Sequence, residues 1–154
     1  MKVERVYTRG AIAVSMDASL DVAAAVMRRH HVGSLLVGEG PQGTGEIVGV
    51  ITDRDIVIQC VADGYDPRTL TVAQVMTPQV AVVREETDLH EALELMHGSG
   101  LRRLAVANGD ERIVGVLSLD DVLDGIAVDM ASLAGTVKRG IQREANAFDP
   151  ILPH

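Results

Sequence analysis

The chain has 154 residues, of which 47% are hydrophobic and 2% aromatic, so a folded core must be built mainly from aliphatic side chains. Its formal net charge is −8, from 22 acidic and 14 basic residues, which argues against general binding to nucleic-acid backbones. No run approaches the roughly 20 apolar residues that span a bilayer. The first residues do not resemble a secretory signal and Cys60 is the single cysteine, so we expect a cytoplasmic protein with no membrane segment and no internal disulfide.

The first predicted elements are an extended stretch over residues 11–15 and an amphipathic helix that begins after Ser19. The helix is indicated by apolar residues at the spacing i, i+3, i+4, i+7, namely Leu20, Ala23, Ala24 and Met27. Two β-type runs follow, at residues 34–37 and 47–51. A second helix then begins at residues 52–56, and its apolar stripe consists of Ile56, Val57, Cys60 and Val61.

The same order recurs in the second part of the chain, which therefore contains an internal repeat. An extended stretch at residues 80–83 precedes a helix whose apolar stripe is Leu89, Ala92, Leu93 and Met96. β-Type runs at residues 103–106 and 113–117 follow, and then a helix from residue 118. Turn residues at 63–67 and a short helix at 71–76 separate the repeats. Because one repeat of roughly 60 residues can bury little apolar surface alone, we expect the two to share a core with a cleft between them.

The last segment has a different pattern. Its apolar residues alternate spacings of three and four, like a coiled-coil seam: Leu123, Ile126, Met130, Leu133 and Val137. Two interpretations stay open, a helix packed on its own domain and a helix packed on a second copy of the protein. Gly135 and Gly140 each weaken a helix by up to ~1 kcal/mol relative to alanine, so this helix needs support from other contacts. We expect the tail beyond Phe148 to be frayed.

Several familiar motifs lack their context. Residues 38–43 match G-x-G-x-x-G, but a strand follows where a dinucleotide fingerprint opens a helix, so a hairpin loop is the better interpretation. The five histidines include no i, i+4 pair and Cys60 has no nearby partner, so we expect no metal site. No G-x-S-x-G elbow and no catalytic pair of carboxylates stands out, and we expect no catalytic residues.

One junction is the same in both repeats. Thr52 and Asp55 follow the second β-run of the first repeat, and Ser118 and Asp121 stand at the matching place in the second. A hydroxyl residue followed three positions later by an acid is typical of a capping box, which is one interpretation. A helix N-terminus also suits phosphate, and a carboxylate one turn further on can accept from ribose hydroxyls. The strand residues just before these motifs, which could pack on a base, are Val50 and Val116.

This arrangement resembles the CBS domain pair, a family named after cystathionine β-synthase, and most of all its short stand-alone bacterial members. The resemblance covers roughly residues 6–123 and rests on Ile-Val-Gly-Val followed by [ST]-x-x-D in both halves, with Met76-Thr77-Pro78 opening the second. It implies an α/β (α+β) fold of two βαββα-like repeats with mixed three-stranded sheets, related by a pseudo-twofold axis, plus a C-terminal helix. The implied ranges are 6–64 for the first repeat, 65–75 for a linker with a short helix, 76–123 for the second repeat, 124–148 for the C-terminal helix and 149–154 for the tail.

The resemblance also implies a ligand, namely AMP, ADP, ATP or S-adenosylmethionine, bound in clefts between the repeats as a regulatory ligand and not as a cofactor. By matching position, the acids hold the ribose, the hydroxyl residues face phosphate and the valines line the base. The implied ligand-binding residues are Val50, Thr52, Asp55, Thr77, Val80, Arg102, Arg103, Val116, Ser118 and Asp121. The two arginines stand where phosphate-binding members carry basic residues, while Gly33 and Ser34 occupy the first repeat, so the two sites are unequal. The alternative is a pair of exposed arginines at a strand edge.

These expectations combine into a regulatory module and not an enzyme. No fused effector domain is expected, since about 30 residues follow the second repeat, so an unidentified protein target or the C-terminal helix must carry the output. Family members commonly dimerise, and we expect a homodimer. Two alternatives stay open: a structural dimer with vestigial pockets, and an enzyme of unknown type.

Overall fold

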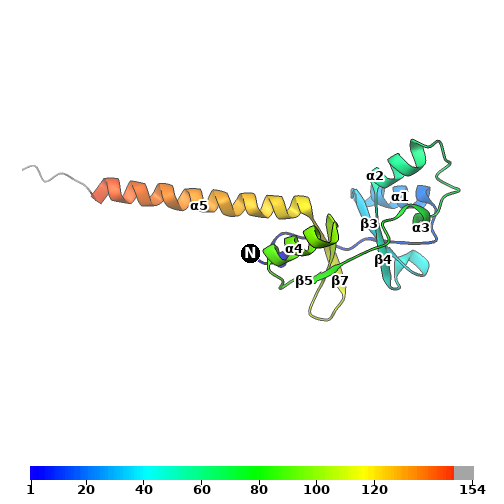
Figure 1. Cartoon of the computed structure of the whole chain (residues 1–154), viewed down its shortest axis with the longest axis horizontal. Helices are drawn as coiled ribbons and strands as arrows, with labels where there is room; N and C mark the ends of the chain where they lie inside the picture. The colour runs from blue at the N-terminus through cyan, green and yellow to red at the C-terminus, as the bar shows by residue number, and fades with distance from the viewer. Residues whose placement is uncertain (148–154) are drawn as a thin grey trace, which may run out of the picture.

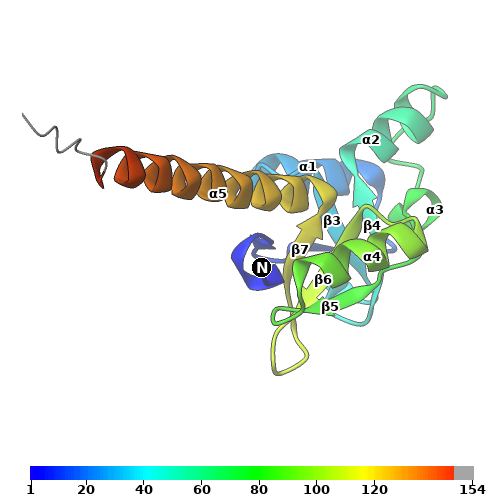
Figure 2. The same cartoon turned by 60° about the vertical axis from the view of Figure 1, so that its left-hand side comes forward.

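The computed structural model describes residues 1–147, so the expected tail at 149–154 and residue 148 lie outside the described residues. Two α/β halves lie side by side, and one long helix leaves the second half and extends away from the body (Figures 1 and 2). The predicted α/β class and the predicted repeat of elements are confirmed.

The first half is a mixed three-stranded sheet covered by helices. Its elements are β2 (Ala13–Ser15), α1 (Leu20–His30), β3 (Ser34–Gly38), the 3-10 turn η2 (Pro41–Gly43), β4 (Ile47–Thr52), α2 (Asp53–Ile56) and the π-helical turn η3 (Val57–Val61). The strand order is β2-β3-β4, with β2 parallel and β4 antiparallel to β3. This sheet is therefore three-stranded and mixed, as expected.

The second half repeats this order with two differences. Its elements are β5 (Val82–Arg84), α4 (Leu89–Ser99), β6 (Arg103–Ala107), β7 (Ile113–Ser118) and α5 (Leu119–Ala147). The sheet has four strands, in the order β1-β7-β6-β5, so the expectation of a second three-stranded sheet was wrong. The helix predicted from residue 118 and the C-terminal helix predicted at 124–148 form one continuous helix, α5, because no residue between them breaks the helical backbone.

The fourth strand is β1 (Thr8–Arg9), which comes from the N-terminal end of the chain and pairs antiparallel with β7. The 3-10 turn η1 (Val3–Arg5) lies next to it, and the buried side chains of Val3 and Tyr7 belong to the core of the second half. The repeat ranges predicted from the sequence stay predictions, but residues at the start of the first range thus pack with the second half. A strand of two residues with a distant partner leaves no periodic signal in the sequence.

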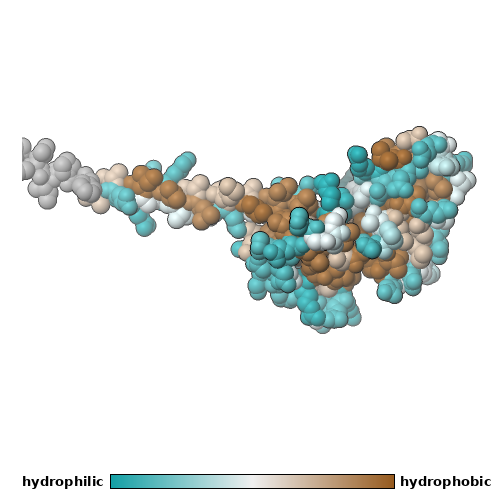
Figure 3. All heavy atoms as spheres, in the orientation of Figure 1, coloured by the Kyte–Doolittle hydropathy of each residue, from teal (hydrophilic) through white to brown (hydrophobic). Residues whose placement is uncertain are grey.

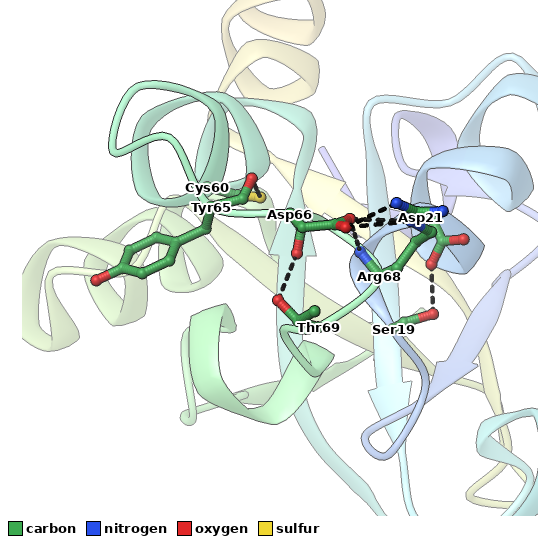
Figure 4. A network of polar contacts seen from close by, with 7 residues as sticks. All are labelled: Ser19, Asp21, Cys60, Tyr65, Asp66, Arg68 and Thr69. Carbon is green, nitrogen blue, oxygen red and sulfur yellow. Dashed lines mark hydrogen bonds and ion pairs between the residues drawn. The ribbon is translucent and has the colours of Figure 1, made fainter.

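The segment between the halves is tied to the start of α1. The Arg68 guanidinium donates three hydrogen bonds to the Asp66 carboxylate, with Nη2 2.8 Å from Oδ2 and Nε 3.1 Å from Oδ1 and 3.2 Å from Oδ2. These bonds lower the pKa of that carboxyl (Figure 4). The backbone amides of Leu20 and Asp21 donate to the carbonyls of Leu70 and Pro67. The short helix α3 (Val72–Val75) then inserts two buried valines into the core of the first half. The predicted linker is therefore part of the first folded body.

Three groups of buried side chains hold the molecule together. Each half has its own aliphatic core, and a third group, formed by Leu36, Val50 and Ala105, lies between the two sheets. The apolar stripe predicted for residues 56–61 is only partly buried. Val57 and Val61 are 52% and 62% exposed, whereas Ile56 and Cys60 of the same predicted stripe are buried. The π-helical turn over Val57–Val61 departs from the 3.6-residue period on which that stripe was based.

The close approach of β1 to β7 depends on a glycine. A Cβ placed on Gly115 would lie 2.3 Å from the Thr8 carbonyl oxygen and 2.5 Å from the Tyr7 ring. We expect Gly115→Ala to lower the free energy of unfolding by about 1–3 kcal/mol, the usual cost of overfilling a packed site. Urea unfolding measures this loss, and Gly109→Ala, where a Cβ meets no atom within 4 Å, is the control. Equal stabilities of the two variants would contradict this account of β1.

Candidate functional site

The junction between β7 and α5 holds the second of the two repeated motifs. The Asp121 amide donates to Ser118 Oγ at 3.1 Å, while the amide and hydroxyl of Ser118 donate to Asp121 Oδ2 at 2.8 and 2.7 Å. This is a reciprocal capping box, so the capping interpretation of the motif is correct. Among the described residues, Asp121 Oδ1 accepts no hydrogen bond, which leaves one carboxylate oxygen for another donor.

The first repeat has the same cap. The Asp55 amide donates to Thr52 Oγ1 at 3.1 Å, and the Thr52 amide donates to Asp55 Oδ2 at 2.9 Å. Both motifs therefore begin a helix directly at the end of a strand. Capping and ligand binding do not exclude each other here, because the cap uses one oxygen of each carboxylate.

A cavity of about 310 Å³ lies beside Ser118 and Asp121, at the small end of the range of ligand pockets. Two more of the predicted ligand-binding residues, Arg103 and Val116, line it as well. Gly33 and Ser34 of the first half form the facing wall. The other lining residues, which the sequence did not single out as parts of a site, are Thr8, Gly10, Ile12, His31, Val32 and Asp120.

Strand register explains why these residues meet. Arg103 of β6 lies directly opposite Ser118 of β7, and Thr8 of β1 lies opposite Val116 on the other side of β7. The lining residues of β1 could not be predicted, because β1 itself could not. Arg102, next in the chain to Arg103, is exposed and is not part of the cavity wall; its carbonyl accepts from the Leu119 amide at 2.9 Å.

His31 reaches the cavity through an unusual backbone conformation. It follows α1 with φ 54° and ψ 43°, which is the left-handed region. The corresponding position at the end of α4 has the same kind of backbone conformation and is occupied by Gly100. Histidine is among the non-glycine residues that adopt this region more readily than most. The structure thus places His31, at the end of α1, in the cavity wall.

The charges at the cavity are mixed. Arg103 contributes a permanent positive charge, and the N-terminus of α5 adds the positive end of a helix dipole. Asp120 and Asp121 contribute negative charge beside that terminus. A ligand with both an anionic group and hydroxyl groups therefore finds a complementary partner for each.

The predicted residues of the other site are not gathered in one cavity in the same way. Val50 and Thr77 form an isolated antiparallel bridge, with N–O distances of 3.0 and 2.9 Å between their backbones. Val50 is buried between the two sheets, and Val80 packs against the same group. A second cavity, of about 520 Å³, is lined by Val80 but not by Thr52 or Asp55. The ligand roles of all these residues stay predictions.

Metal ligands do not cluster in the part of the chain that the structure describes. Within residues 1–147, no three side chains of His, Cys, Asp or Glu come together as a metal ion would need. The expected absence of a metal site nevertheless stays a prediction. In the same residues, no helix is both long and apolar enough to cross a bilayer.

A protein-family model described as CBS domain matches residues 3–61 and again residues 72–128. This chain belongs to the CBS domain family. The two matches correspond to the two halves of the fold, so the chain is a CBS domain pair, and the resemblance inferred from the sequence is confirmed.

Relatives of this CBS domain pair occur in bacteria and archaea. The CBS domain-containing protein YhcV of Bacillus subtilis is 31% identical over 120 residues, which are 78% of this chain and 81% of that protein. The uncharacterized protein MK0525 of Methanopyrus kandleri is 32% identical over 97 residues, or 63% of this chain, and the match spans 48% of the length of that protein.

Solved CBS domains have the same fold. The CBS domain of a bacterial CNNM/CorC family Mg²⁺ transporter, solved in complex with ATP, matches 82% of this chain and 87% of its own chain with a TM-score of 0.68. The identity is 22%, so this likeness concerns the fold of the CBS pair alone.

Proposed function

We propose that the cavity beside Ser118 and Asp121 binds an adenine nucleotide and that this binding is regulatory. The observation that carries the proposal is the meeting of three different ligand-binding features in one cavity. These are the unused oxygen of Asp121, the guanidinium of Arg103 in β6 together with the nearby N-terminus of α5, and the aliphatic surface of Val116 and Ile12. In order, they suit the hydroxyls of a ribose, a phosphate and a base.

The ligand class is supported by the fold. A CBS domain of this fold was solved with ATP, which makes adenine nucleotides the first ligands to test. We propose a second, weaker site at Thr52 and Asp55, with Val50 and Thr77 nearby. In the first repeat, the strand residue opposite Thr52 is Ser34, whereas the residue opposite Ser118 is Arg103. The first site therefore lacks the positive charge that would bind phosphate, and we expect it to bind more weakly.

The proposed regulation needs a recipient of the signal. We propose a homodimer in the cytoplasm that acts on a separate protein, and no catalytic step is assigned to the chain. Cys60 is fully buried, which agrees with a structural thiol in a reducing compartment. The hydroxyl–carboxylate pair in the cavity, Ser118 and Asp121, caps the N-terminus of α5, and this structural use agrees with binding rather than turnover.

A thermal-unfolding screen tests the proposal directly. Wild-type protein is heated with AMP, ADP, ATP, S-adenosylmethionine or adenosine, with guanosine monophosphate as the control for the base. A ligand at 100 times its dissociation constant stabilises a folded protein by ~2.7 kcal/mol, which gives a clear rise in Tm. A rise with adenine compounds alone supports the proposal. If none of them raises Tm at millimolar concentration, the cavity is vestigial and the chain is a structural dimer.

A further inference from the structure

The helix α5 is far longer than its contact with the body requires. It has 29 residues, which at 1.5 Å per residue make a rod of about 43 Å. Val122 and Gly125, in its first two turns, are buried, whereas the later turns stand clear of the body (Figures 1 and 2). The interpretation of this segment as a helix packed on its own domain was therefore wrong beyond those turns.

An apolar stripe runs along the projecting helix and is exposed. Met130, Leu133 and Val137 are 65%, 67% and 61% exposed. The stripe continues in both directions through Leu123, Ile126 and Ile141. Figure 3 shows hydrophobic atoms recurring along the visible face of α5. An isolated helix that contains Gly135 and Gly140 is only marginally stable in water, so this stripe needs a partner surface.

The charges of α5 are divided between its two ends. Its first part carries four acids and no base, namely Asp120, Asp121, Asp124 and Asp129. The first three charged residues of its later part are basic, namely Lys138, Arg139 and Arg143, and Glu144 follows them. Two copies of the helix side by side in the same direction would bring like charges together. In opposite directions, each acidic end lies beside a basic end.

We propose that α5 pairs with α5 of a second copy in antiparallel orientation along this stripe. With Met130 and Leu133 at the centre of the contact, Asp124 of one helix lies level with Arg139 of the other. Asp120 then lies level with Arg143. The pairing buries the stripe of both copies over the same length of helix. Asp124 and Arg139 project from the side of the helix away from the stripe, so the charges favour the antiparallel direction through their distribution along the axis and not as ion pairs across the contact. This inference specifies the surface and geometry of the proposed homodimer, and it does not depend on the nucleotide.

Two equally exposed side chains on different faces of α5 provide a matched pair of variants. Leu133 lies in the stripe and Val128 lies outside it, and both are 67% exposed. We expect Leu133→Glu to raise the dimer dissociation constant about a hundredfold or more, because each dimer loses two buried leucines and gains two buried charges. Val128→Glu introduces the same charge into the same helix and leaves the dimer intact. Sedimentation equilibrium gives the dissociation constant of each.

The direction of pairing is tested with a spin label on a cysteine introduced at Gln142. Antiparallel pairing about the centre given above separates the two labelled positions by about 30 Å along the helices, and parallel pairing brings them side by side. Cys60 is fully buried, and wild-type protein treated with the label is the control. A short label-to-label distance would overturn the antiparallel arrangement. A dimer that survives Leu133→Glu would overturn the α5 contact but leave the proposed homodimer standing, and a monomeric wild type would overturn both.

Discussion

We expect Asp121→Ala to lower the affinity for AMP by roughly ten- to a hundredfold. Asp121 Oδ2 is committed to the amide and hydroxyl of Ser118, and Oδ1 is the oxygen that can accept from the hydroxyls of a ribose. Loss of hydrogen bonds to a charged group costs about 1.5–3 kcal/mol, which corresponds to that loss of affinity. Isothermal titration calorimetry measures it, and S-adenosylmethionine and adenosine, which share the ribose, should show the same loss.

The matched control is Asp53→Ala. Asp53 stands in the first turn of α2, is exposed, and accepts from the Arg54 amide at 2.8 Å, so its removal also perturbs a helix start. It is not among the residues lining the cavity beside Ser118. Because Asp121→Ala also removes a cap, Asp121→Asn is measured with it; the asparagine keeps an oxygen for the Ser118 amide. Equal AMP affinities of the Asp53 and Asp121 variants would contradict the assignment of the ribose site.

The sequence predicted those parts of the fold that have local signals. The apolar stripes that begin at Leu20 and Leu89 correspond to α1 and α4, and the Ile-Val-Gly-Val runs correspond to β4 and β7. The capping boxes are as local as the stripes, and both formed. Each of these features depends on residues within one or two turns of one another, which is the range over which periodicity and capping act.

The parts of the fold and of the site that the sequence did not predict depend on contacts between distant segments. Thr8 lines the cavity because β1 pairs with β7, more than a hundred positions away, and no spacing pattern encodes that pairing. The heptad spacing from Leu123 identified a stripe but not the surface that covers it. The two arginines also looked equivalent in the sequence. The structure separates them, because Arg103 begins β6 and lies opposite Ser118, whereas Arg102 precedes the strand and is exposed.

That separation leads to a prediction about phosphate. We expect wild-type protein to prefer AMP to adenosine, and Arg103→Ala to lose most of that preference while keeping its affinity for adenosine. Arg103 lies opposite Ser118 in the sheet, beside the N-terminus of α5, and a guanidinium can bind phosphate with two hydrogen bonds. The AMP affinity should fall roughly ten- to a hundredfold, the usual loss for a charge-assisted contact. Calorimetric titration of both ligands into both proteins gives the preference.

Arg102→Ala is the control for net charge, since it removes the same side chain one residue away. Arg102 is exposed and outside the cavity wall, so its loss should leave the preference for AMP nearly unchanged. His31 is the competing source of positive charge, because it lines the same cavity. A preference for AMP that survives Arg103→Ala but disappears in His31→Ala would show that His31, at the end of α1, binds the phosphate. A preference for AMP that falls equally in both arginine variants would mean that the arginines attract the phosphate only by long-range electrostatics. Added salt would then weaken the preference.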